Sequence, residues 1–134
     1  YIESSLQIDK VIESVDGEQD GSDAVLGDYR AAESQRFYLS SAGNGYYNIV
    51  SLDTGKLLTV DTLSRVDGTE VGFETAGAGD RQLWKVKYSS SGYFYIIAFN
   101  GMYLTVEDAN AGADSKLVVN VGSNSKNQKF RFIL

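Results

Sequence analysis

With 134 residues the chain fits a single domain, and the absence of Cys and His removes disulfides, thiolate chemistry and the commonest general base and metal ligand. A formal net charge of −6 with scattered basic residues argues against a nucleic-acid partner, because phosphate binding requires Lys and Arg clustered on one face. No apolar run approaches the ~20 residues that a membrane span requires.

The predicted strands follow one another as short, mostly alternating runs. A faint strand at 1–6 precedes runs at 10–12 and from 21 onward; the series returns at 47–52, 56–58 and 69–75, and again at 94–99, 102–104 and from 114. Val71 and Phe73 face inward in this pattern while their neighbours face water, which is the period of two of a strand. Tight turns with positive φ are predicted at Asn44-Gly45, Asp53-Thr54-Gly55, Asp67-Gly68 and Asn100-Gly101.

A Gln-x-aromatic triplet closes each series of strands. The triplets are Gln35-Arg36-Phe37, Gln82-Leu83-Trp84 and Gln128-Lys129-Phe130, at intervals of 47 and 46 residues. Three units of four strands, at about 1–45, 46–92 and 93–134, favour an all-β, single-domain β-trefoil with pseudo-threefold symmetry, because propellers typically need four or more blades and solenoids carry distinct capping units. We expect a core of Phe37, Trp84 and Phe130 with Ile12, Leu58, Phe73, Leu104, Leu117 and Val119.

The run GYYNIVSLDTGKLLTV, followed by VDGTEV and DRQLWKV, resembles a ricin-B-type lectin repeat, a module also found as a carbohydrate-binding appendage of secreted glycosidases. The resemblance implies shallow sugar pockets, up to one per repeat. Each pocket uses an acidic residue on the second strand, an aromatic platform after the third strand and polar residues before the Gln. The carboxylate accepts hydrogen bonds from two adjacent sugar hydroxyls while the apolar face of the sugar ring lies on the aromatic side chain.

Few of these positions keep the family's residues. The acidic place falls on Glu13, Thr59 and Thr105. The aromatic place falls near Gly27 to Tyr29 in the first copy, and on Glu74 and Asn120 in the others. Ser34, Arg81 and Asn127 precede the Gln.

The first copy is therefore the leading candidate pocket, with Glu13, Asp16 or Asp28 as acceptor, Tyr29 as platform and Gln35 as supporting donor. Each residue also has an ordinary structural interpretation: Glu13 as a solvated strand residue, Tyr29 as a rim aromatic, and the Gln as a tie between a strand and a loop. Asn120 and Asn127 form the second candidate, without an evident aromatic. A Glu74–Arg81 salt bridge is expected to fill the pocket of the second copy.

The resemblance implies a non-catalytic carbohydrate-binding domain without a cofactor, which we expect to be monomeric, extracellular and appended to a larger glycan-active protein. Its partner is expected to be a galactoside or a plant-type polysaccharide. The alternative is a protein-interaction trefoil that has lost sugar binding. An enzyme is disfavoured. The acidic stretch from Asp16 to Asp28 leaves a weak calcium site open, although Gly27 stands where a calcium loop carries a bidentate Glu.

Overall fold

The computed structural model describes residues 1–15 and 20–134, which form twelve strands, four short 3₁₀ turns and no α-helix. The first four strands are β1 (Ile2–Ser4), β2 (Lys10–Ser14), β3 (Ser22–Asp28) and β4 (Phe37–Gly43). They are followed by β5 (Tyr46–Ser51), β6 (Leu57–Val60), β7 (Thr69–Glu74) and β8 (Trp84–Ser90). The last four are β9 (Tyr93–Ala98), β10 (Tyr103–Val106), β11 (Leu117–Asn120) and β12 (Phe130–Phe132). The 3₁₀ turns are η1 (Glu33–Gln35), η2 (Gly79–Gln82), η3 (Glu107–Ala109) and η4 (Lys126–Gln128).

Alternation and turn chemistry explain these strands. In β7, Val71 and Phe73 are 3% and 0% exposed while Glu70 faces solvent, so the predicted period of two is confirmed. Asn44 and Gly45 have φ of 56° and 81°, which are the two positive angles of the tight turn between β4 and β5.

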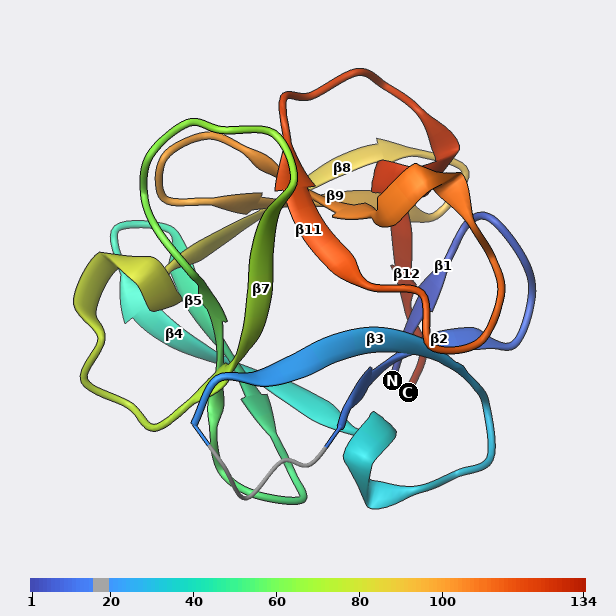
Figure 1. Cartoon of the computed structure of the whole chain (residues 1–134), viewed down its shortest axis with the longest axis horizontal. Coiled ribbons are helices and arrows are strands. Elements are labelled where there is room, and N and C mark those ends of the chain that lie inside the picture. The colour runs from blue at the N-terminus through green and yellow to red at the C-terminus, as the bar shows by residue number, and fades with distance from the viewer. Residues whose placement is uncertain (16–19) are drawn as a thin grey trace.

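Two sets of strands build the fold. The strands β1, β12, β9, β8, β5 and β4 are hydrogen-bonded in that order and form the barrel wall. The hairpins β2–β3, β6–β7 and β10–β11 cover one end of it. Across this end β3 pairs with β7, β7 pairs with β11, and Val25 bridges to Lys116, so the three strands meet around the centre of the view in Figure 1.

The core lies between the barrel wall and the three hairpins. Trp84 and Phe130 are fully buried, as are the six aliphatic and aromatic residues predicted beside them, so these predictions are confirmed. The indole Nε1 of Trp84 donates to the carbonyl of Leu58 at 2.9 Å, which satisfies its buried polar group. Phe37 differs from the other triplet aromatics, because it is only partly buried and packs against the core from its edge.

The barrel seam beside Phe37 accounts for this exposure. No ladder joins β1 to β4 in the described part of the chain. A mostly apolar cavity of about 280 Å³ lies there, lined by residues 1–2, 37–39 and 132–134. The ring of Phe37 therefore has cavity on one side, and Phe73 stacks on it at a centroid distance of 5.5 Å.

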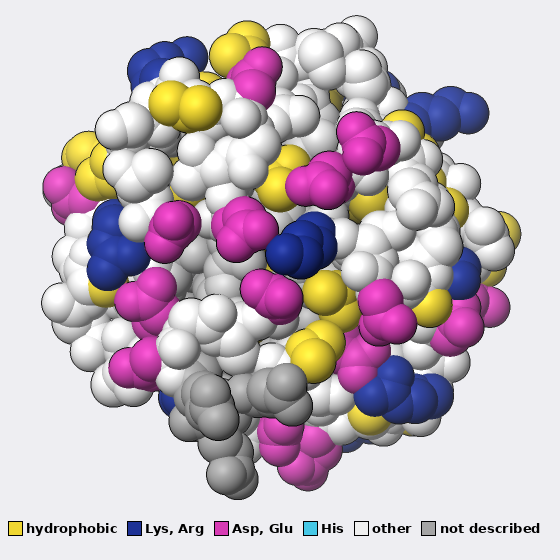
Figure 2. Space-filling view, viewed as in Figure 1, with side chains coloured by type: hydrophobic (Ala, Val, Ile, Leu, Met, Phe, Trp, Pro, Cys, Tyr) yellow, Lys and Arg dark blue, Asp and Glu magenta, His cyan; other side chains and the backbone are white. Residues whose placement is uncertain are grey.

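Acidic side chains are spread over the end of the barrel that β3, β7 and β11 cover (Figure 2). Lys116 lies among them and forms an ion pair of 3.1 Å with Glu70. The hydrogen bond to Glu70, with the nearby charges of Asp23 and Glu107, raises the pKa of Lys116. None of the helical turns in the described ranges has the length and hydrophobicity needed to cross a membrane.

We predict that Gly72→Ala destabilises the fold by about 1 to 3 kcal/mol. Gly72 lies opposite Asp23 where β3 and β7 pair, and a Cβ there would stand 2.4 Å from the backbone carbonyl oxygen of Ser22. Relief requires the two strands to separate, because the obstructing atom belongs to the backbone. Urea unfolding measures the loss, with Gly112→Ala in an exposed loop as the control. Equal unfolding midpoints for the two variants would contradict the close approach of β3 and β7.

Candidate functional site

The Gln side chains of the three triplets are buried and make the same hydrogen bonds in each third of the chain. Each amide nitrogen donates to a carbonyl at or just beyond a strand end: Gln35 to Asp28 at 2.8 Å, Gln82 to Thr75 at 3.0 Å, and Gln128 to Val121 at 2.9 Å. Each amide oxygen accepts from backbone N–H groups of the following loop, namely those of Arg30, of Gly77 and Ala78, and of Ser123. The Gln residues therefore tie a strand to a loop.

The same amide nitrogens also contact the residue at the acidic place of each third. Gln35 lies 3.3 Å from Glu13 Oε1, Gln82 lies 3.1 Å from Thr59 Oγ1, and Gln128 lies 3.2 Å from Thr105 Oγ1. All three partners are buried. The three thirds of the chain thus share this arrangement and differ in the residues that lie in front of the Gln.

In the first third, the carboxylate of Glu13 is fully occupied by protein donors. The guanidinium of Arg30 donates to both oxygens, at 2.8 Å for Oε1, while Gln35 donates to Oε1 and Ser34 to Oε2. Hydrogen bonding from Arg30 holds the pKa of Glu13 below its ordinary value. Glu13 is therefore neither solvated nor available to sugar hydroxyls while Arg30 remains in place.

Gly27 explains how a carboxylate fits at this depth. A Cβ at Gly27 would lie 2.1 Å from Glu13 Oε1, so any other residue would displace the Glu13 side chain. The absence of a side chain at Gly27 therefore leaves the room in which the Glu13 carboxylate meets Arg30.

Tyr29 and Asp28, which are also predicted for this site, make contacts of their own outside the ion pair. Tyr29 is 36% exposed and stacks on Tyr1 with ring centroids 4.2 Å apart. Asp28 is exposed and forms an ion pair with Lys10 at the surface. Asp16, with the start of the predicted calcium stretch, lies outside the described residues. Of that stretch, Asp20 accepts hydrogen bonds from the N–H and the hydroxyl of Thr75 and pairs with Lys56.

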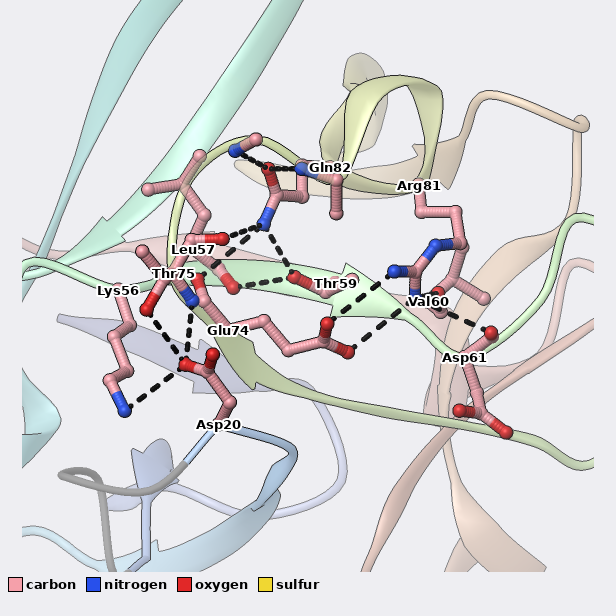
Figure 3. A network of polar contacts seen from close by, with 12 residues as sticks. Asp20, Lys56, Leu57, Thr59, Val60, Asp61, Glu74, Thr75, Arg81 and Gln82 are labelled. Carbon is pink, nitrogen blue, oxygen red and sulfur yellow. Dashed lines mark hydrogen bonds and ion pairs between the residues drawn. The ribbon is translucent and has the colours of Figure 1, made fainter.

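The second third contains the predicted ion pair of Glu74 and Arg81, with a closest contact of 3.4 Å (Figure 3). The guanidinium of Arg81 also donates to the carbonyls of Val60 and Asp61. A pocket of about 50 Å³ beside it is lined by Thr59, Asp61, Glu74 and five residues of β3 and β7 or next to them. This space is too small for a sugar ring. In the part of the chain that the structure describes, no cluster of His, Cys, Asp or Glu is arranged to hold a metal ion.

The third site contains uncharged groups instead of an ion pair. Asn120 accepts from the N–H of Gly68 at 2.7 Å, so its carbonyl oxygen is fixed and its amide nitrogen is directed elsewhere. Asn127 donates from η4 to the carbonyl of Val106 at 3.1 Å, which leaves its own oxygen as an acceptor. Both predicted residues thus adjoin the β10–β11 hairpin.

Sequence reasoning missed an aromatic residue at this third site. Tyr103 lies directly opposite Asn120 in the β10–β11 ladder, so the two side chains share one face. Its ring is half-buried and covers Gly122, where a Cβ would stand 2.8 Å from the ring. Tyr95 packs against it at a centroid distance of 5.0 Å and donates its hydroxyl to Asn124. The aromatic residue was expected after the third strand of the third copy, whereas Tyr103 lies on its second strand, β10. Only the register in which β10 pairs with β11 could have revealed it.

Comparisons with known proteins agree with this architecture. The sequence matches the family described as ricin-type β-trefoil lectin domain-like over residues 5–74 and again over 33–119. A search of curated proteins finds no match.

Three solved structures illustrate the likeness. ThreeFoil, a designed threefold-symmetric protein, is 26% identical with a TM-score of 0.92, over 97% of this chain and 94% of that one. An exo-β-1,3-galactanase from Clostridium thermocellum is 24% identical with a TM-score of 0.93, and the match covers 99% of this chain but only 29% of the galactanase. The ricin B-like lectin of Macrolepiota procera, in complex with lactose, is 14% identical with a TM-score of 0.81, over 97% of this chain and 90% of the lectin.

We predict that Glu13→Gln loses stability in a pH-dependent way. The folded protein depresses the pKa of Glu13, so the ionised carboxylate stabilises the fold fully above pH 4.5, and this contribution disappears as the pH falls through the folded pKa. The stability gap between wild type and Glu13→Gln should therefore be widest near pH 7 and narrow below pH 4.5. Thermal unfolding at several pH values measures it. Asp53→Asn, in an exposed turn, controls for the loss of one negative charge; a gap that is equal at all pH values would exclude the ionised pair as its source.

Proposed function

Because the chain belongs to the family of ricin-type β-trefoil lectin domain-like proteins, we propose that it is a non-catalytic carbohydrate-binding domain. In this proposal β1–β4, β5–β8 and β9–β12 are the three repeats of a β-trefoil around a pseudo-threefold axis. Equivalent hydrogen bonds of Gln35, Gln82 and Gln128 support that assignment. The scaffold then offers three corresponding sites with different side chains.

The third site carries the proposal, on the strength of one observation: the half-buried ring of Tyr103 lies opposite Asn120 on one face of a hairpin. An aromatic face beside amide groups is the pairing that a pyranose requires, because the ring offers apolar C–H groups on one side and hydroxyls along its edge. Asn127 adds an acceptor from η4. This site contains no internal ion pair that a sugar would have to displace.

A galactoside is the proposed ligand. β-Galactosides present a continuous apolar patch on one face of the sugar, which suits stacking on a single tyrosine. The lactose complex of the Macrolepiota procera lectin and the exo-β-1,3-galactanase, both similar to this chain in fold, support this choice. A shallow site with one aromatic ring should bind weakly, with a dissociation constant on the order of millimolar, about −4 kcal/mol.

Weak binding suits a domain that works as part of a larger assembly. We propose a monomeric, extracellular module attached to a glycan-active protein, which it holds close to galactose-containing polysaccharide. The galactanase supports this arrangement, since a domain of the same fold takes up only 29% of that chain. Several copies or several sites would raise the overall affinity through avidity.

A protein-interaction module is the second candidate. The apolar cavity of about 280 Å³ at the β1–β4 seam favours it, because Tyr38 and Leu39 are 51% and 38% exposed there. Sugar titrations separate the two functions, since an interaction module would leave every glycan unbound.

We predict that Tyr103→Ala weakens galactoside binding by at least about tenfold, which corresponds to about 1.4 kcal/mol. Titration of isotope-labelled protein with lactose, arabinogalactan and xylan oligosaccharides, followed by amide NMR, measures it. In the wild type the perturbed amides should be those of Asn120, Gly122 and Ser123. Tyr88→Ala is the matched control, because Tyr88 is 58% exposed at a different part of the surface. Absence of binding to all three ligands at 10 mM or more, roughly ten times the expected dissociation constant, would contradict the proposed function.

Gly122→Ala provides an independent test of the ring position. The added methyl group would push the Tyr103 ring away from the loop that follows β11, so affinity should fall by less than in Tyr103→Ala, with little change in unfolding temperature. The effect should vanish when Tyr103 is already alanine, because the two changes act on the same contact. An additive loss in the double variant would mean that Gly122 acts by another route.

A further inference from the structure

The proposed function leaves open why the first site, which has both a carboxylate and an aromatic ring, should not bind sugar as well. The side chain of Glu13 is 10% exposed and that of Arg30 is 56% exposed, so the guanidinium covers the carboxylate from the solvent side. Its two terminal nitrogens, Nη1 and Nη2, donate to the two carboxylate oxygens of Glu13. Two neighbouring sugar hydroxyls would donate to a carboxylate in the same two-pronged manner.

The first and third sites share a tyrosine pair at the same location. Ser4 pairs with Phe130 and Ala98 pairs with Trp84, so Tyr1 and Tyr95, each three residues earlier, hold equivalent positions. Tyr1 stacks on Tyr29, and Tyr95 packs on Tyr103.

The rings that face Tyr1 and Tyr95 come from different strands. Gly122 is the counterpart of Tyr29, and the Tyr103 ring fills the space above Gly122. A tyrosine therefore occupies corresponding space at both sites, although it comes from the end of β3 in one and from β10 in the other.

The second site provides the contrast. It also has an ion pair, of Arg81 with Glu74, although here the two side chains are exposed to similar extents, 33% and 25% (Figure 3). The counterparts of the tyrosines, however, are Asn48, Leu57 and Ala76, none of which has an aromatic ring. Removing the arginine from the second site would expose a carboxylate without a platform, whereas removing it from the first would expose both.

We infer that Arg30 is the residue that determines how many glycan sites the domain has, because its guanidinium occupies the first site as an internal ligand. This inference rests on the proposed function for the class of ligand. A sugar reaches Glu13 only in the fraction of molecules in which the Arg30 side chain has moved away from the carboxylate. The apparent affinity of the first site is therefore the intrinsic affinity multiplied by that fraction. Replacing Arg30 removes the competitor and leaves Gln35 and Ser34 to orient the carboxylate.

The test uses the full chain and NMR titration with lactose, which reports each site separately. In a Tyr103→Ala background, Arg30→Ala should restore binding, with perturbed amides at Tyr29, Ser34 and Gln35 and an affinity on the order of tenfold above that of Tyr103→Ala alone. Arg30→Gln, which keeps a polar side chain without the charged fork, should behave in the same way. Arg81→Ala in the same background is the matched control and should gain nothing.

The outcomes separate this inference from the proposed function. If wild type binds through Tyr103 while the Arg30→Ala and Arg30→Gln double variants stay unbound, although NMR spectra show them folded, the inference is wrong and the proposed function stands. If the double variants bind at Tyr29 although wild type shows no binding at Tyr103, the inference stands and the third site is wrong. Equal gains from Arg30→Ala and Arg81→Ala would also overturn the inference, because the tyrosine pair would then be irrelevant.

Discussion

One buried primary amide supports each third of the molecule. Leaving such a group without partners in the interior costs about 1 to 3 kcal/mol, and here its nitrogen and oxygen are both satisfied by a strand end and the loop after it. The 3₁₀ turns η1, η2 and η4 each end on the Gln that supplies this amide. The aromatic residue two positions later is thereby directed toward the core, so the same short motif fixes the loop and fills the interior.

The hydrogen bonds of the Gln amides to the strand ends and loops are made to backbone groups. The side chains in front of the Gln can therefore differ from one third of the chain to the next. The position that contacts the Gln carries a carboxylate once and a threonine twice, and none of these changes alters the hydrogen bonds to the strand end. The charged groups also differ between the three sites. The first contains the ion pair of Glu13 with Arg30, the second that of Glu74 with Arg81, and the third has no ion pair among its described residues. Two thirds of the chain thus contain an ion pair beside the buried Gln, built from different positions in each, and the third contains uncharged groups.

The sequence predicts the features that follow from the regular spacing of the Gln-x-aromatic triplets. It does not predict those that follow from the register in which the strands pair. Trp84 and Phe130 could be assigned to the core because an aromatic residue that recurs at intervals of 46 or 47 residues is expected to face the interior. The burial of Glu13 could not, because its partner Arg30 lies 17 residues away in a loop whose path is set by Gln35. Tyr103 was missed for a related reason, since its neighbour Asn120 lies on another strand. The partial exposure of Phe37 depends on how the barrel closes, which no local pattern encodes.

The two ends of the described chain are joined by a pair of hydrogen bonds. The amino group of Tyr1 donates to the carbonyl of Ile133, and the N–H of Ile133 donates back to Tyr1, both at 2.8 Å; both ends lie close together in Figure 1. A linker of a few residues would therefore close the chain into a circle, and new ends could be opened at the Asn44-Gly45 or Ser91-Gly92 turn without cutting a strand. The same adjacency lets the domain be inserted into a surface loop of a host protein, because it enters and leaves at one point.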